Sequence, residues 1–264
     1  MKIAFFKKKY LFFVFLFLLT FLLTLNQLLF RHEEDNKKEY NELYDVKLNR
    51  LDNMDRLLEY WNRITIQNGL EVNTREHVGL ARDIVAQRFY HGYARYNIRN
   101  NYIAFFAGRC IWNHFLGIVI PDDILKYNGA LCSQQAIVFG ELLKERGYKI
   151  RKVMLEGHFC KEVFYNNSWH FYDPDMEPNF SKEMPKPGIK DLMGNKDLIY
   201  GAYEGKLDKI SIDKIFRKYK TGKINSYPAK KMIVFHYVTK LLSNWLWVLF
   251  LWLALYFRNR PSGR

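Results

Sequence analysis

Hydrophobic and polar positions divide the chain into two apolar runs and a mixed middle. Tyr10–Phe30 is almost unbroken Leu and Phe, and a second apolar run covers Leu241–Phe257. As a helix rising 1.5 Å per residue, the first run can cross a hydrocarbon layer of about 30 Å, whereas the second spans only about 25 Å. The pattern predicts transmembrane helices at residues 10–30 and 232–257. Whether the second crosses fully stays open, because the longer span would place Lys240 in the membrane.

The middle of the chain contains three stretches in which apolar residues recur at helical spacing. They are Asp45–Ile66, Thr74–Tyr90 behind an Asn73/Thr74 cap, and Cys132–Arg146 before a stop at Gly147. We expect the first two helices to pack around the third. Cys132 falls in the first turn of the third helix, where unpaired N–H groups and the helix dipole favour thiolate over thiol.

The pattern then changes to strand-like runs rich in aromatic and β-branched residues. A strand at Lys149–Leu155 precedes a hairpin that turns at Asn166 and Asn167. With these two as the turn residues, Cys160 lies opposite Asp173 and His158 opposite Asp175. His158 and Asp173 are then diagonal neighbours on one face, within side-chain reach, whereas a three-residue loop would separate them.

Cys132, His158 and Asp173 supply the side-chain types of an activated cysteine nucleophile. An imidazole that takes the thiol proton makes the sulfur more nucleophilic, and a carboxylate orients the imidazole. Taken singly, each residue has a commoner explanation, because buried cysteines, strand histidines and Asp-Pro turns are widespread. The flanking residues favour the catalytic interpretation.

The flanking residues share order and spacing with a known family. They are Gly129-Ala-Leu-Cys132, Gly147, Gly157-His158, Glu162-Val163, Trp169 and Asp173-Pro174. Over about a fifth of the chain they resemble the core of the transglutaminase-like superfamily. The resemblance implies an α+β, papain-like fold that acts on amide bonds. It also implies that Cys132 is the nucleophile, His158 the general base and acid, and Asp173 the orienting group.

The sequence does not single out one set of residues for the oxyanion hole or for the pocket that would bind the acyl group. The backbone N–H of Cys132 is the natural first donor to an oxyanion. Many relatives carry a tryptophan two residues after the histidine, where this chain has Cys160 on the same strand face as His158. The candidates for a second donor and for the pocket are Tyr127, Asn128, Gln134, Cys160 and Trp169.

The remaining cysteines give weaker predictions. Cys110 lies in the apolar run Phe105–Phe115, which predicts burial. Cys160 can pair with Cys110, or reversibly with Cys132, if the domain is exported. We expect no metal and no cofactor, because no CxxC or HxxxH pair supports a site at Cys132, His158 and Cys160.

Charge and topology suggest where the chain acts. The net charge of +14 suits anionic lipid or an acidic cell-wall polymer, and without a zinc finger, recognition motif or phosphate loop we expect no nucleic acid partner. Lysines precede the first apolar run and arginines follow the second, so both ends are predicted to be cytoplasmic. No small-residue cleavage site follows the first run, which favours an uncleaved anchor over a removed signal peptide.

These observations predict a membrane-anchored transglutaminase-like cysteine enzyme in a bacterial inner membrane, with its catalytic domain on the extracytoplasmic side. It would act through a thioester on peptide or protein amides, with cell-envelope peptides as plausible substrates. Hydrolysis and transfer to an amine stay equally open, because the same three residues serve both. The alternative is a catalytically silent, membrane-tethered peptide-binding module of the same fold.

The predicted organisation has six segments. They are a basic cytoplasmic N-terminus (1–9), a transmembrane helix (10–30), the transglutaminase-like catalytic domain (31–178), a basic connector (179–231), the second transmembrane helix (232–257) and a basic cytoplasmic tail (258–264).

Overall fold

The computed structural model describes residues 2–29 and 43–259, with side chains from residue 8 onward. Residue 1 of the expected basic N-terminus, residue 30 of the first expected span, residues 31–42 of the expected catalytic domain and residues 260–264 of the expected basic tail lie outside the described residues. The chain divides into two compact units. The helical unit comprises Met1–Glu33, Arg95–Ile118 and Lys230–Arg264, and the mixed unit comprises Glu34–Ala94 and Val119–Ala229.

The elements follow this division. The helical unit contains α1 (Lys2–Leu29), α4 (Tyr102–Cys110), the 3₁₀ turn η2 (Asn113–Leu116) and α10 (Lys230–Asn259). The helices of the mixed unit are the 3₁₀ turn η1 (Val46–Arg50), α2 (Met54–Gln67), α3 (Arg75–Arg88), α5 (Pro121–Ile124), α6 (Cys132–Glu145), α7 (Ile189–Met193), α8 (Lys196–Ala202) and α9 (Lys209–Ile215). Its strands are β1 (Tyr90–His91), β2 (Gly129–Ala130), β3 (Lys149–Met154), β4 (Phe159–Tyr165), β5 (Ser168–Tyr172) and β6 (Lys220–Thr221).

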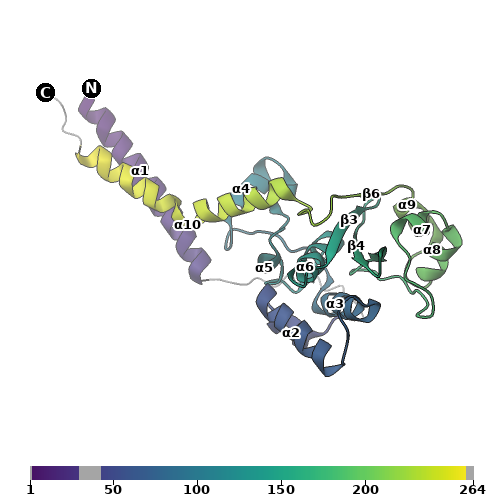
Figure 1. The fold of residues 1–264 in the computed structure, drawn as a ribbon. Helices are drawn as coiled ribbons and strands as arrows, with labels where there is room; N and C mark the ends of the chain where they lie inside the picture. Colours follow the sequence, from purple (N-terminus) through teal and green to yellow (C-terminus); the bar gives the residue numbers. More distant parts are fainter. Residues whose placement is uncertain (1, 30–42, 260–264) are drawn as a thin grey trace. The chain divides into compact units, whose positions relative to one another are not determined.

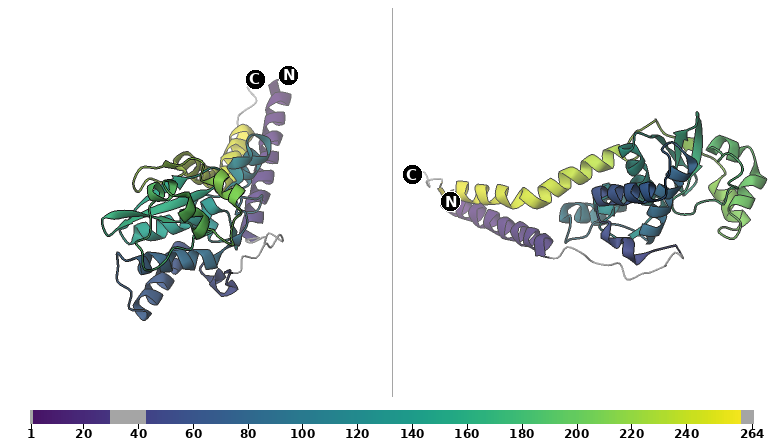
Figure 2. Two further views of the ribbon diagram at one scale, coloured as in Figure 1. Left: turned by 90° about the vertical axis from the view of Figure 1, so that its right-hand side faces the viewer. Right: turned by 60° about the horizontal axis from the view of Figure 1, so that its bottom comes forward.

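In the helical unit, α1 and α10 run antiparallel and side by side (Figures 1 and 2). The rings of Phe13 and Phe257 stack at 5.2 Å near the chain ends. Toward the other end of α1, the Thr24 hydroxyl donates to the carbonyl oxygen of Ser243 at 2.9 Å. Aromatic packing and this interhelical hydrogen bond help to hold the pair together, as in helices that associate within lipid.

A small polar network joins α4 to α10 inside this apolar unit. The Asn101 side chain donates to the Thr239 hydroxyl at 2.9 Å and accepts from the Ser243 hydroxyl at 3.1 Å. All three side chains are buried. Buried polar groups are costly unless they are paired, so the network satisfies groups that would otherwise destabilise the unit.

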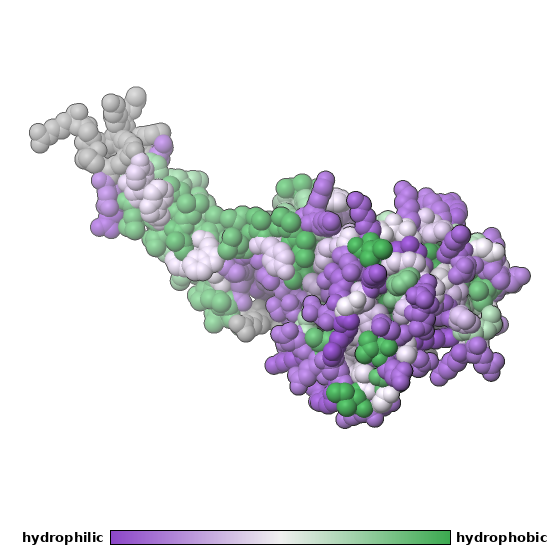
Figure 3. All heavy atoms as spheres, in the orientation of Figure 1, coloured by the Kyte–Doolittle hydropathy of each residue, from purple (hydrophilic) through white to green (hydrophobic). Residues whose placement is uncertain are grey.

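Many apolar side chains of α1 and α10 are exposed, and Figure 3 shows a hydrophobic surface along both helices. Among the described residues, two helices are long and apolar enough to cross a membrane, Lys8–Leu29 and Lys230–Asn259. A soluble core helix would be mostly buried, whereas here only 11% and 17% of the two apolar windows are buried. Two terminal apolar helices, expected from the sequence, are thus present and suit association with a membrane.

The mixed unit is built on a four-stranded antiparallel sheet with the order β5-β4-β3-β6. Tyr165 pairs with Ser168, and Lys161 pairs with Tyr172, so Asn166 and Asn167 form the two-residue turn. Both turn residues have positive φ, 46° and 60°, which asparagine tolerates and which suits the twist of a hairpin. The predicted register of this hairpin is confirmed.

Helices cover both faces of the sheet. α6 packs on β3 and β4, where Gly140 allows close approach because a Cβ atom there would lie 2.8 Å from the Lys161 side chain. Val153, Cys160 and Phe171 point to the opposite face and share a buried apolar cluster with α7, α8 and α9. Residues 189–216 therefore contribute to the core of the mixed unit, which differs from the basic connector expected at 179–231.

Other local predictions hold in part. Thr74 caps α3 and Cys132 begins α6, as expected. The single helix expected over Asp45–Ile66 is instead η1 followed by α2, because the Asn53 side chain caps a new helix. The expected burial of Cys110 is wrong: it ends α4 and is exposed.

The hairpin turn gives the first test. Valine at position 167 would be strained at positive φ, so Asn167→Val should lower the free energy of unfolding by about 1–3 kcal/mol. Asn167→Gly, which is free of that strain, is the matched control and should stay within about 0.5 kcal/mol of the parent. Thermal unfolding in detergent measures both, and equal stability of the two variants would contradict the assigned turn.

Candidate active site

The first component of the site is the N-terminus of α6. Cys132 is its first residue, and the N–H groups of Gln134 and Gln135 both donate to the carbonyl of Leu131 at 2.9 Å. Among the described residues, the N–H groups of Cys132 and Ser133 donate no backbone hydrogen bond. Two backbone donors and the positive end of the helix dipole are therefore available beside the Cys132 sulfur.

The second component is a buried hydrogen bond between His158 and Asp173. Nε2 of His158 lies 2.6 Å from Oδ2 of Asp173, and both side chains are almost fully buried. A tight turn positions the histidine: Gly157 has a φ of 76°, and the N–H of Leu155 donates to the carbonyl of His158. Glycine adopts this left-handed conformation without strain, so Gly157 places His158 directly before β4.

The Asp173 carboxylate is fully buried and well satisfied. Besides His158, it accepts from the Tyr203 hydroxyl at 3.1 Å and from the N–H groups of Asp175 and Met176 at 3.2 and 3.1 Å. Burial alone would raise the pKa of Asp173, but His158 and these donors outweigh it and lower the pKa below its usual 3.8. The carboxylate therefore stays ionised at neutral pH.

The electrostatics of His158 follow from this partner. Burial alone would lower the pKa of His158, but the Asp173 carboxylate, with smaller contributions from Cys160 and Cys132, raises it well above the usual 6.5. Because the pKa is higher in the folded than in the unfolded chain, the imidazolium contributes fully to stability below the unfolded value of about 6.5. That contribution to stability is lost only as the pH rises through the higher pKa that His158 has in the folded chain.

The sulfur of Cys132 and the His158 ring lie close together. The Cys132 sulfur, a ring nitrogen of His158 and a carboxylate oxygen of Asp175 are all within 4.8 Å of one another. Since Nε2 of His158 is engaged by Asp173, Nδ1 is the nitrogen left for the thiol. The three residues singled out by the sequence therefore form a chain from Cys132 through His158 to Asp173.

A second His–Asp pair stands beside the first. Nδ1 of His91 lies 3.1 Å from Oδ1 of Asp175, and the Gln135 side chain donates to the same oxygen at 2.7 Å. The Asp175 side chain is only 5% exposed, whereas that of His91 is 51% exposed. Sequence reasoning did not propose His91 or Gln135 as site residues. The predicted hairpin register places Asp175 opposite His158, and this was the one feature of the sequence that could have indicated Asp175 as a site residue.

An open cavity of about 1160 Å³ contains these groups. Its lining residues include Cys132, Ser133, His158, His91, Asp175 and Lys206. Asp173 does not line this cavity, because it is buried behind His158. The nucleophile and its proton carrier are thus open to a substrate, while the orienting carboxylate is shielded from water.

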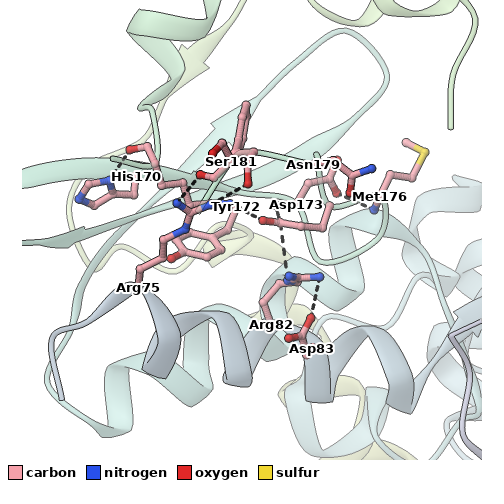
Figure 4. Close-up of polar contacts among 12 residues, drawn as sticks. Arg75, Arg82, Asp83, His170, Tyr172, Asp173, Met176, Asn179 and Ser181 are labelled. Carbon is pink, nitrogen blue, oxygen red and sulfur yellow. Dashed lines mark hydrogen bonds and ion pairs between the residues drawn. The ribbon is translucent and has the colours of Figure 1, made fainter. Parts of the chain in front are cut away.

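The loop after Asp173 is held against α3 by a cluster of polar contacts (Figure 4). The Arg75 guanidinium donates to the carbonyls of Phe180, Ser181 and Met184. Glu177 accepts from the N–H of Asp173 at 2.9 Å and pairs with Lys186. These contacts fix the path of the backbone after Asp173. They thereby help to hold the Asp173 carboxylate in the position where it faces His158.

Cys160 is buried against the same imidazole. It is fully buried, and its burial raises the pKa of its thiol above the usual range. His158, Cys160 and Asp173 form a second group with ligand atoms within 4.8 Å of one another. Either Cys/His/Asp group has the spacing to hold a metal ion, but only that of Cys132, His158 and Asp175 faces the cavity. Cys110, Cys132 and Cys160 are all free thiols, so neither expected disulfide is present.

The other predicted pocket residues do not line this cavity. The Gln134 side chain bonds to the backbone of Ala94 and Leu131. The Tyr127 carbonyl accepts from Arg88, and the Asn128 carbonyl accepts from the N–H of Tyr90. Trp169 lies in β5 beneath the Arg151 guanidinium, which is 4.2 Å from its ring centre. Gln134, Tyr127 and Asn128 therefore make structural contacts around the segment that leads into α6.

Comparisons of the chain with profiles of known families, with curated proteins and with solved structures gave no match.

The charge on His158 can be tested by removing its partner. Asp173→Asn keeps an acceptor of the same size but removes the negative charge, so it should lower the pKa of His158 by about 1 to 3 pH units. Ring ¹⁵N chemical shifts measured against pH report this change. Tyr203→Phe, which removes one hydrogen bond and no charge, is the matched control and should have a smaller effect. An equal effect of the two variants would show that the charge of Asp173 does not control His158.

Proposed function

We propose that the chain is a membrane-anchored, transglutaminase-like cysteine enzyme that acts on amide or peptide bonds through a thioester. The observation that carries this proposal is the buried His158–Asp173 bond beside a cysteine at a helix N-terminus, facing a cavity. The succession of helix, strand and hairpin, with Cys132 at the start of the helix, supports a papain-like core. Cys132 is the nucleophile, His158 the acid and base, and Asp173 the orienting group.

In the first half-reaction, the Cys132 thiolate attacks the carbonyl carbon and the carbonyl oxygen becomes an oxyanion. The N–H groups of Cys132 and Ser133 at the start of α6 are the donors in the best position to stabilise that charge. The imidazolium of His158 gives its proton to the departing amine, and the C–N bond breaks. A thioester on Cys132 and a neutral His158 remain, with Asp173 holding the ring in place.

In the second half-reaction, water or a primary amine attacks the thioester. His158 takes a proton from the attacking group, the C–S bond breaks, and the thiolate–imidazolium pair is restored. Water gives a protease or amidase, and an amine gives an acyltransferase. The same residues serve both outcomes, so the choice depends on what the cavity binds beside Cys132.

The membrane part of the proposal rests on α1 and α10. Their length and exposed apolar side chains support anchoring. The lysines before the apolar run of α1 and the arginines that follow the apolar run of α10 support cytoplasmic chain ends and a catalytic unit on the extracytoplasmic side of a bacterial inner membrane. Peptides and proteins of the cell envelope are then the accessible amide substrates.

Capture of an acyl group tests the chemistry. The full-length chain in detergent, treated with a p-nitrophenyl ester, should release p-nitrophenol in a burst and carry an acyl adduct at Cys132 in peptide mass spectra. Cys132→Ala should lower the burst rate about 10³-fold or more. Cys110→Ser removes an exposed thiol of the helical unit and is the matched control. Adducts spread equally over Cys110 and Cys132, or an inert Cys132, would favour a silent peptide-binding module instead.

Labelling from one side of the membrane tests the topology. On a cysteine-free background, Lys182→Cys in an exposed loop of the mixed unit should react with an impermeant maleimide in intact spheroplasts. Lys2→Cys, before the first apolar run, should react only after permeabilisation. The reverse pattern would place the mixed unit in the cytoplasm.

A further inference from the structure

The helical unit exposes large apolar side chains on α4 and η2 as well as on its two long helices. Phe106, Ile111 and Trp112 are 45%, 77% and 52% exposed, although they lie close together in the sequence. Three such side chains in so short a segment indicate a surface that a partner or a lipid layer covers. The position of α4 along the two long helices shows which of these fits.

The contacts of α4 place its first turn at a defined level beside α1. Thr24 donates to the carbonyl oxygen of Ser243, so these two residues lie at the same level of the helix pair. The N–H of Ile103, near the start of α4, donates to the Ser243 hydroxyl at 3.3 Å. Leu29, where α1 ends, lies only about 7 Å beyond Thr24 along the helix axis. The start of α4 is therefore level with the apolar run of α1.

The end of η2 lies on the other side of this boundary. The rings of Phe115 and Phe235 stack at 4.4 Å, and Nε2 of His236 lies 3.1 Å from the Phe115 carbonyl oxygen. Phe235 precedes Ser243 by about 12 Å along α10. Because α1 and α10 run antiparallel, that level is past the end of α1. Residues Asn101–Phe115, which we call the α4–η2 segment, thus extend across the end of the apolar run.

We propose that the α4–η2 segment inserts into the extracytoplasmic leaflet of the bilayer and is a third membrane-contacting element of the chain. Phe106, Ile111 and Trp112 contact acyl chains at the edge of the hydrocarbon layer. Arg109, whose guanidinium lies over the Phe105 ring, reaches the lipid phosphates. The inference rests on the membrane anchoring in the proposed function and is independent of its cysteine chemistry.

Charge and continuity favour a lipid surface over a protein partner. The stretch Arg95–Ile118 contains three arginines and no aspartate or glutamate, which suits anionic headgroups. Tryptophan and arginine are both typical of the zone where hydrocarbon meets headgroups. The exposed apolar side chains of α4 also continue those of α10, against which α4 packs. A bilayer that surrounds the two long helices therefore reaches the α4–η2 segment as well.

The backbone of the segment suits this environment. A Cβ atom at Gly108 would lie 2.4 Å from Cγ of Leu116, so η2 packs directly against α4. At the bend between them, the N–H groups of Ile111 and Trp112 both donate to the Ala107 carbonyl, at 2.9 and 3.2 Å. These backbone donors are thus satisfied within the segment, as lipid requires.

Lipids that carry a nitroxide measure whether position 111 lies in the bilayer. On a cysteine-free background, the full-length chain with Ile111→Cys is labelled with the fluorophore NBD and reconstituted in vesicles of phosphatidylcholine and phosphatidylglycerol. Ile66→Cys is the matched control, because Ile66 lies in α2 of the mixed unit and is 79% exposed. Leu18→Cys, at an exposed position in the middle of α1, reports on the anchor itself.

We expect a nitroxide at carbon 5 of an acyl chain to quench the label at position 111 at least about threefold more than the label at position 66. A nitroxide at carbon 5 should also quench position 111 more than one at carbon 12, because the segment lies at the edge of the hydrocarbon layer. The label at position 18 should show the reverse order.

The role of Arg109 is tested with the same label. Arg109→Glu places negative charge at anionic headgroups and should lower the quenching at position 111 about twofold. Arg63→Glu is the matched control, because Arg63 is also exposed and also lies over a neighbouring ring, that of Tyr60. It should leave the quenching at position 111 unaltered. Equal effects of the two variants would contradict a contact between Arg109 and lipid phosphates.

The remaining outcomes separate this inference from the proposed function. Quenching at position 111 as weak as at position 66 would overturn the inference while the anchoring stands. A blue-shifted emission without quenching by lipid would overturn it too, because it would show a protein covering this face. If the label at position 18 is not quenched either, the anchoring fails together with the inference. Acylation of Cys132 is measured separately, so the cysteine chemistry is judged on its own result.

Discussion

The hydrogen bond between His158 and Asp173 is the interaction on which the rest of the site depends. It joins two strand ends, it is removed from solvent, and it keeps positive charge on the imidazole beside Cys132. An isolated buried carboxylate would be costly, but Tyr203 and two backbone N–H groups complete its hydrogen bonding. The pair is therefore positioned by the fold before any substrate arrives, which is the condition for electrostatic preorganisation.

Chain order explains why the three residues meet. α6, β3, β4 and β5 follow one another with short turns, and the strands run antiparallel. The start of α6, the start of β4 and the end of β5 must then lie at the same end of the unit, and these positions carry Cys132, His158 and Asp173. The helices α7 to α9 add the second constraint, because α8 ends just before Tyr203, whose hydroxyl reaches Asp173. The mixed unit thus extends beyond the 31–178 segment expected to be catalytic.

Local signals account for the parts of the fold and the site that could be predicted. Two asparagines between aromatic runs determined the hairpin register, Thr74 and Cys132 marked helix starts, and strand parity placed His158 near Asp173. Contacts between distant segments could not be read in the same way. Gln134 binds the backbone of Ala94, and His91 reaches Asp175, across 40 and 84 residues of sequence. The periodicity of apolar residues indicates neither that the Gln134 side chain is engaged by the backbone nor that a second His–Asp pair forms. The burial of α7 to α9 depends likewise on a sheet face that only tertiary structure creates.

The most direct test of the central claim is the rate of alkylation of Cys132 by iodoacetamide as a function of pH, with exposed Cys110 in the same chain as the reference. If the Cys132 thiolate forms an ion pair with the His158 imidazolium, which Asp173 stabilises, Cys132 reacts almost as fast at about pH 6 as at about pH 8. The reactivity of an ordinary thiol falls steeply below about pH 8.5. Parallel pH profiles for Cys132 and Cys110 would contradict the account, because they would show a cysteine that His158 does not activate.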